Sequence, residues 1–137
     1  IKSDAQIIVA RSAIKTNDEA KAKEAYAKLQ KIAKGELAAE ALYYDAYFKN
    51  KEGKFEPSNV VVQKIAQDYS GYKYYGAKSL VIMAKNFYGL KDSFQATYIL
   101  ESVIENFKEY TDVIEEAQKE LDFIKGEEAK RNSSITN

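Results

Sequence analysis

Hydrophobic residues recur every three or four positions along most of the chain, and no stretch keeps the alternation of apolar and polar residues that marks a half-buried strand. Polar or glycine-containing breaks interrupt the pattern, for example at residues 16–18, 34–35 and 51–53. The pattern therefore predicts an all-α fold of helices joined by short turns. Seven apolar stripes mark the expected helices, at residues 7–14, 22–33, 42–47, 61–69, 80–88, 96–107 and 113–124.

Small residues recur at fixed intervals within these stripes. Ala10 precedes Ala46 by 36 positions, and Ala84 follows Ala46 by 38. Ser58 and Ala96 are also 38 positions apart, and bulky apolar residues follow each of them four and seven places later. Because a small side chain lets two helix backbones approach closely, these intervals predict a repeated pair of packed helices.

At these positions the chain resembles the tetratricopeptide repeat (TPR) family. Residues 39–43 (AEALY) resemble the opening of the family's first helix, and residues 53–55 (GKF) resemble its turn between helices. The spacings Ser58-x-x-x-Val62 and Ala96-x-x-x-Leu100 resemble its A-x-x-x-F signature. The resemblance implies a right-handed α-solenoid over residues 1–130, with three helix pairs near 3–36, 39–70 and 77–108 and a C-terminal capping helix near 112–129. The polar residues 131–137 are expected to form a disordered tail.

The chain also departs from the family pattern. No repeat carries the usual Trp, Asp45 stands where Leu is usual, and Ser70 and Lys108 stand where Pro is usual. The interval of 38 residues exceeds the usual 34, and the extra residues fall at 70–76, where an extended turn is expected.

A narrower resemblance concerns bacterial cell-envelope proteins with degenerate repeats. Residues 74–80, 92–96 and 116–121 resemble segments of bacteroidete-type TPR proteins and of accessory factors for outer-membrane assembly and the Tol-Pal system. This resemblance implies a periplasmic or envelope location, with the cytoplasm as the alternative. The last helix carries the polar surface of a cap and the first does not, so we expect the C-terminal part of a longer repeat protein.

The composition disfavours several kinds of function. The 137 residues include no His and no Cys, which removes the usual general base, thiol nucleophiles and the commonest zinc ligands. Lys and Arg number 21 and so do Asp and Glu, a balance that argues against a dedicated nucleic-acid partner. No apolar run approaches the roughly 18 residues of a transmembrane segment.

No motif predicts catalysis, a cofactor or a metal site. Residues 71–79 come near the phosphate-binding pattern GxxxxGK[ST], but Ala77 separates Gly76 from Lys78 and no strand precedes them. Neighbouring acids such as Glu115 and Glu116 point in different directions from a helix, which is typical of a solvated surface. We therefore expect a non-catalytic protein–protein interaction scaffold.

The TPR resemblance implies a concave groove, lined by the first helix of each repeat, that receives a protein or peptide segment. Tyrosine suits such a surface because it offers a large area, few rotors and a hydroxyl group. The same tyrosines could instead cover neighbouring helices, and both interpretations stay open. The matching positions predict a partner-binding groove made by Arg11, Tyr43, Tyr47, Asn50, Lys51, Lys78, Val81, Lys85 and Tyr88, with Asp4, Ile7 and Glu40 beside them.

Other surfaces and functions remain open. Tyr72, Tyr74 and Tyr75 could form an exposed aromatic lip that stacks on a ligand, or could pack the turn against the next helix. Residues 21–34 hold five lysines and one acid, either a solvated face or a contact for an acidic partner. The alternatives to groove binding are a structural spacer or self-association module, and a carboxylate-based enzyme or glycan binder around Tyr43 and Tyr47.

Overall fold

A computed structural model describes residues 2–136, except for the side chains of residues 135 and 136. The described chain is all-α and has no strand, which confirms the predicted class and the seven helices. Single turns separate the helices, and the side chains of Asp18 and Asp92 cap α2 and α6 by accepting hydrogen bonds from backbone N–H groups. The helices are α1 (Lys2–Lys15), α2 (Glu19–Ile32), α3 (Glu36–Lys51), α4 (Phe55–Asp68), α5 (Lys73–Gly89), α6 (Ser93–Asn106) and α7 (Thr111–Thr136).

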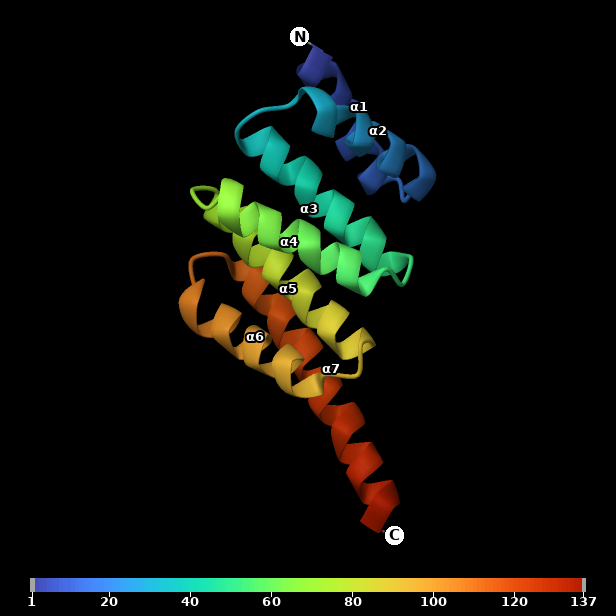
Figure 1. Cartoon of the computed structure of the whole chain (residues 1–137), viewed down its shortest axis with the longest axis vertical. Helices are drawn as coiled ribbons and strands as arrows, with labels where there is room; N and C mark the ends of the chain where they lie inside the picture. The colour runs from blue at the N-terminus through green and yellow to red at the C-terminus, as the bar shows by residue number, and fades with distance from the viewer. Residues whose placement is uncertain (1, 137) are drawn as a thin grey trace.

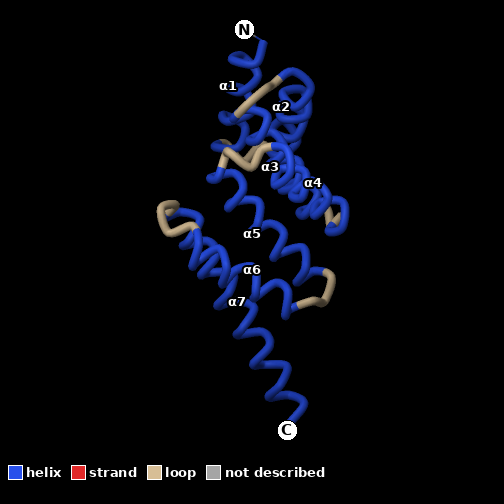
Figure 2. Tube along the Cα trace, turned by 60° about the vertical axis from the view of Figure 1, so that its left-hand side comes forward, coloured by secondary structure: helices blue, strands red, loops and turns tan. Residues whose placement is uncertain are grey.

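Each helix packs against the next in an elongated stack. The chain reverses at every turn, so that α1 lies at one end of the molecule and α6 and α7 lie at the other (Figure 1). The odd-numbered helices also contact each other directly, since α3 packs against α5 and α5 against α7. After a rotation of the view, the turns are seen to alternate between the two sides of the stack (Figure 2).

The recurring small residues lie in buried contacts between helices. Ala10, Ala46 and Ala84 on the odd helices are completely buried. So are Ala22, Ser58 and Ala96 on their partner helices. The Ser58 hydroxyl donates a hydrogen bond to the carbonyl oxygen of Ala46 at 2.7 Å, which leaves no unpaired polar atom at that contact. The sequence intervals therefore correspond to a repeated packing position.

Two predicted boundaries are wrong. The turn before α5 is short, because the helix begins at Lys73, and Tyr74 and Tyr75 belong to its first turn rather than to an extended loop. At the other end, α7 continues to Thr136 through the residues predicted to be a disordered tail. No proline interrupts α7, and ion pairs join Glu127 to Lys130 and Glu128 to Arg131 along its surface.

Candidate partner-binding face

Side-chain contacts join each odd helix to the next, and the accessible side chains around these contacts make up one candidate surface. Arg11 on α1 reaches Glu40 on α3, Asn50 on α3 reaches Asn86 on α5, and Lys85 on α5 reaches Glu116 on α7. We call this surface the odd-helix face. Its members with solvent exposure are Arg11, Tyr47, Asn50, Lys51, Lys78, Lys85 and Tyr88.

A buried carboxylate organises the first half of this face. Glu40 is almost fully buried and accepts two hydrogen bonds from the Arg11 guanidinium, at 2.7 and 3.1 Å. It also accepts the hydroxyl protons of Tyr26 at 2.7 Å and Tyr75 at 2.9 Å. Because the four donors come from α1, α2 and α5, this single side chain fixes three helices against α3.

The hydrogen bonds determine the charge state of this cluster. Burial raises the pKa of Glu40, but the donors on Arg11, Tyr26 and Tyr75 outweigh it and leave the pKa below its ordinary value. Burial and the hydrogen bond to Glu40 raise the pKa of Tyr26, which keeps that hydroxyl protonated as a donor. A carboxyl with a lowered pKa does not suit a general acid at neutral pH, so Glu40 serves the packing of the helices.

An amide ladder crosses the middle of the stack. The Asn50 side-chain amide donates to the Asn86 oxygen at 2.8 Å, and the Asn86 amide donates to the Asn59 oxygen at 2.8 Å. Asn86 is completely inaccessible to solvent, so both of its polar groups depend on these partners. The ladder fixes α3, α5 and α4 in one register and holds the partly buried Asn50 in place.

Lys78 lies among aromatic rings. Its ammonium nitrogen is 4.6 Å from the centre of the Tyr43 ring, 5.6 Å from that of Tyr74 and 5.9 Å from that of Tyr44. No ion pair or hydrogen bond to the Lys78 ammonium is found among residues 2–136. The rings stabilise the positive charge without using its three donors, which remain available to an anion in solution.

The far half of the face is tied to α7. Lys85 pairs with Glu116 at 3.1 Å, and the Tyr88 ring meets Phe123 edge to face with 6.2 Å between centres. Tyr88 also lines a hollow of about 400 Å³ with Glu128 and Arg131, where α7 extends past the end of α5. The positions of Lys85 and Tyr88 are therefore set before any partner binds.

The predicted groove residues divide into two groups. Tyr43 and Val81 are buried, as are Ile7 and Glu40, so the prediction that they face a partner is wrong. Tyr43 packs against the neighbouring tyrosines 44, 47 and 75, and Val81 belongs to the core between α5, α6 and α7. The accessible group lies on the odd-helix face. Arg11 and Lys51 are exposed, and the partly buried members are Tyr47, Asn50, Lys78, Lys85 and Tyr88.

The tyrosines near the turn before α5 pack against their neighbours. Tyr74 donates to Asp112 at 2.6 Å and meets Tyr110 edge to face, whereas Tyr75 donates to Glu40. The Tyr72 hydroxyl approaches Gly35, where an added Cβ would lie only 3.2 Å from it. Tyr74 and Tyr75 are thus partly buried and packed against other helices, which favours the packing interpretation of this segment over an exposed lip.

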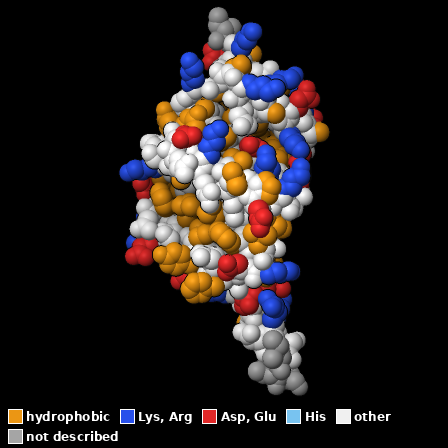
Figure 3. All heavy atoms as spheres, in the orientation of Figure 1, with side chains coloured by type: hydrophobic (Ala, Val, Ile, Leu, Met, Phe, Trp, Pro, Cys, Tyr) orange, Lys and Arg blue, Asp and Glu red, His pale blue; other side chains and the backbone are white. Residues whose placement is uncertain are grey.

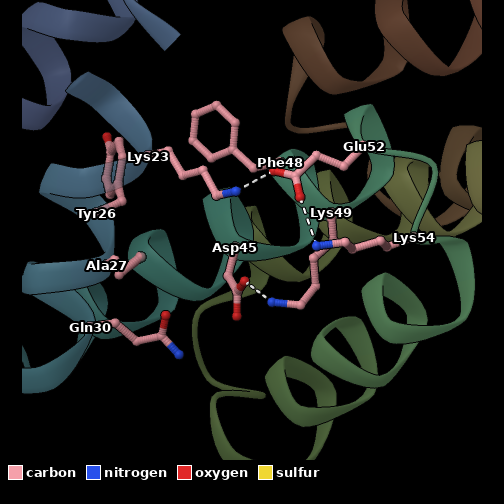
Figure 4. A pocket seen from close by; sticks show the side chains of 10 residues that line it. Lys23, Tyr26, Ala27, Gln30, Asp45, Phe48, Lys49, Glu52 and Lys54 are labelled. Carbon is pink, nitrogen blue, oxygen red and sulfur yellow. Dashed lines mark hydrogen bonds and ion pairs between the residues drawn. The ribbon is translucent and has the colours of Figure 1, made fainter. Parts of the chain in front are cut away.

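A separate polar hollow of about 110 Å³ lies between α2 and α3 (Figure 4). Its charged side chains pair with each other, since Glu52 accepts from Lys23 and Lys54, and Asp45 accepts from Lys49. The lysine-rich helix α2 is therefore partly neutralised on this side. Because the charges are already satisfied, this hollow offers less to a ligand than the Lys78 site does.

Sequence reasoning missed the partners that hold the face together. Glu40 was placed on the groove, but its donors Tyr26 and Tyr75 lie 14 and 35 residues away in the chain. Asn59 and Asn86 carried no signal beyond being polar residues inside apolar stripes. That anomaly is the one available clue, because a buried amide requires a partner.

Comparison of the chain with protein-family models, with curated proteins and with solved structures finds no match. Within residues 2–136, no group of acidic side chains is arranged to hold a metal ion. No helix in that range has both the length and the apolar character needed to cross a membrane.

Proposed function

We propose that the chain is a right-handed α-solenoid of the TPR type, with α1–α2, α3–α4 and α5–α6 as helix pairs and α7 as the capping helix. Two observations support this arrangement. Every even helix packs against the odd helices on both sides of it. Positions 36 and 38 residues apart also share the same burial, as Ala10, Ala46 and Ala84 do.

On this fold, the odd-helix face binds a segment of a protein partner without catalysing a reaction. The carrying observation is Lys78, whose ammonium lies among three aromatic rings and forms no ion pair with a described carboxylate. Tyr47 and Tyr88 are partly buried rings elsewhere on the same face, and Asn50 offers an amide. These groups favour a segment with an acidic side chain beside apolar ones.

The buried supports of the face lower the cost of binding. The Glu40 cluster and the asparagine ladder fix the helices that carry Arg11, Asn50 and Lys78. Side chains that are ordered in advance lose less conformational entropy when a partner arrives. The face therefore resembles a preorganised docking surface more than a catalytic pocket, and the carboxylate-enzyme alternative gains no support from Glu40.

The experiment is a selection of displayed peptides on the wild-type protein, followed by calorimetric titration of the enriched sequences. The Tyr47→Ala/Lys78→Ala variant should weaken their binding at least tenfold, which corresponds to about 1.4 kcal/mol. The matched control is Val60→Ala/Lys64→Ala on the exposed side of α4, which should change affinity less than twofold. Circular dichroism and urea midpoints confirm that both variants are folded.

Two results would contradict the proposal. Either no peptide is enriched above background, or the enriched peptides bind the Tyr47→Ala/Lys78→Ala variant as tightly as the wild type. The first result would favour a structural spacer, and the second would move the binding site to another surface of the molecule.

A further inference from the structure

The outer side of α1 carries an apolar surface that no other described residue of the chain covers. Ile8 is 69% exposed and Val9 is 40% exposed, and Ala5 and Ser12 lie beside them at helical spacing. We call these four residues the α1 outer face. Exposed single hydrophobic residues are common, but here two large ones adjoin two small ones on the same side of a helix.

The other odd helices bury most of this same side. Counting 36 and then 38 residues along the chain from Ala5 leads to Ala41, Ser79 and Ala117, all of which are buried. The equivalents of Ile8 on the next two odd helices are Tyr44, stacked on Tyr26 of α2, and Ile82, packed with Val62 and Ile65 of α4. The α1 outer face therefore has the composition of a helix-docking surface, without a helix on it.

A second uncovered apolar surface lies at the opposite end of the molecule. Phe94 is 77% exposed and Tyr98 is 64% exposed on α6, and Glu101 and Glu105 continue the same side of that helix. We call these four residues the α6 aromatic face. Phe94 also borders a hollow of about 450 Å³ between α6 and α7, large enough to receive an apolar side chain.

The two ends carry opposite charge. Residues 2–34 contain eight Lys and Arg against four Asp and Glu, whereas residues 93–136 contain five against ten. Figure 3 shows basic side chains gathered over α1 and α2, and apolar side chains over α6. Lys2 and Lys21 near the α1 outer face have no carboxylate partner in the described part of the chain, and Glu101 and Glu105 have no basic one.

We propose that the α1 outer face docks on the α6 aromatic face of a second copy of this chain. Ile8 and Val9 of one copy pack against Phe94 and Tyr98 of the other, while lysines around α1 meet Glu101 and Glu105. The two faces differ and lie at opposite ends, so the contact is head-to-tail and each added copy leaves one face of each kind free. Neither face shares a residue with the odd-helix face, so this contact is separate from the proposed peptide site.

Analytical ultracentrifugation tests the inference with variants that block one face each. The wild type, and the control Val60→Glu on α4, should show a weight-average mass that rises with concentration past that of a dimer. Ile8→Glu should remain at the 15.5 kDa monomer mass, and Phe94→Glu likewise. An equimolar mixture of these two variants should form a dimer and nothing larger, because each supplies the face that the other lacks.

Raising the salt concentration should weaken the association at least tenfold, since opposite charges surround the apolar contact. A wild type that stays monomeric from micromolar to millimolar concentration would overturn the inference. This result needs no variant, so it holds even if a variant fails to fold. Association that stops at a dimer, or that survives in Ile8→Glu or Phe94→Glu alone, would also overturn it. The first of these two results would indicate a symmetric contact, and the second a contact elsewhere.

Discussion

Helices α1 and α7 lie at opposite ends of the stack, and each lacks a packed neighbour on one side in the part of the chain that the structure describes. On α7, the uncovered side is polar. Asp122 stands 38 positions after the buried Ala84, and Gln118 and Lys125 are exposed beside it. On α1, the uncovered side carries Ile8 and Val9 instead.

The difference separates a capped end from an open one. The apolar side of α7 packs on α6, with Ala117, Leu121 and Ile124 buried. The side that carries Gln118, Asp122 and Lys125 is exposed to water. A terminal helix of this composition ends a helical stack in a stable form. On α1, the side exposed to water is apolar, and the same side of α3 and α5 packs against a neighbouring helix. The composition of α1 is therefore that of an internal helix. The two end helices thus expose different sides, polar on α7 and apolar on α1, and this difference predicts where further contacts form.

The largest effect expected from this comparison is at the position shared by Ala84 and Asp122. Ala84→Asp places a charge in the fully buried contact between α5 and α6, which should cost about 4 kcal/mol or more of unfolding free energy. Asp122→Ala removes a charge from water, so it should change the unfolding free energy by less than about 0.5 kcal/mol. Urea unfolding followed by circular dichroism measures both, and equal losses would refute α7 as a cap.

A smaller effect is expected at Glu40, which holds the open end of the molecule to α3 through Arg11. Its folded-state pKa is below the ordinary value, so its stabilising contribution is complete above the ordinary carboxyl pKa and is lost as the pH falls through the lower, folded-state value. Glu40→Gln should therefore cost about 1–3 kcal/mol at pH 7, and the difference from wild type should shrink as the solution becomes acidic.

Urea unfolding across a series of pH values measures this difference. Glu109→Gln in the exposed turn between α6 and α7 is the matched control, because it removes a carboxylate without an ion-pair partner among the described residues. A Glu40→Gln deficit that stays constant down to pH 3 would show that the carboxylate charge contributes nothing to the folded state.

Much of the fold could be predicted from the sequence because its signals are local. Apolar spacing predicted seven helices, and the recurrence of Ala10, Ala46 and Ala84 predicted positions that are completely buried. Pro57 lies in the first turn of α4, where its missing N–H costs nothing. Helix ends were harder to predict. Tyr74 and Tyr75 fit either a loop or a helix in the sequence, because their hydroxyl partners on α7 and α3 lie far away in the chain.

The site was predicted only in part because solvent exposure depends on neighbouring helices. Tyr47 and Lys51 stay accessible, whereas Tyr43 on the same helix is covered by three other rings. Helical spacing places all three toward one side, but it does not show how closely α5 approaches. The role of Lys78 likewise depends on rings from two helices, which no local pattern brings together.

Comparing Ile8 with Ile82 shows most directly whether α1 exposes a side that the inner odd helices bury, because both are the same residue at the same position of an odd helix. Unfolding in urea of Ile8→Ala and Ile82→Ala, at a protein concentration where the chain is monomeric, measures the cost of each substitution. We expect a loss of about 2–4 kcal/mol for Ile82→Ala and less than about 0.5 kcal/mol for Ile8→Ala. Losses of similar size would contradict the claim that α1 exposes a side which the inner helices bury.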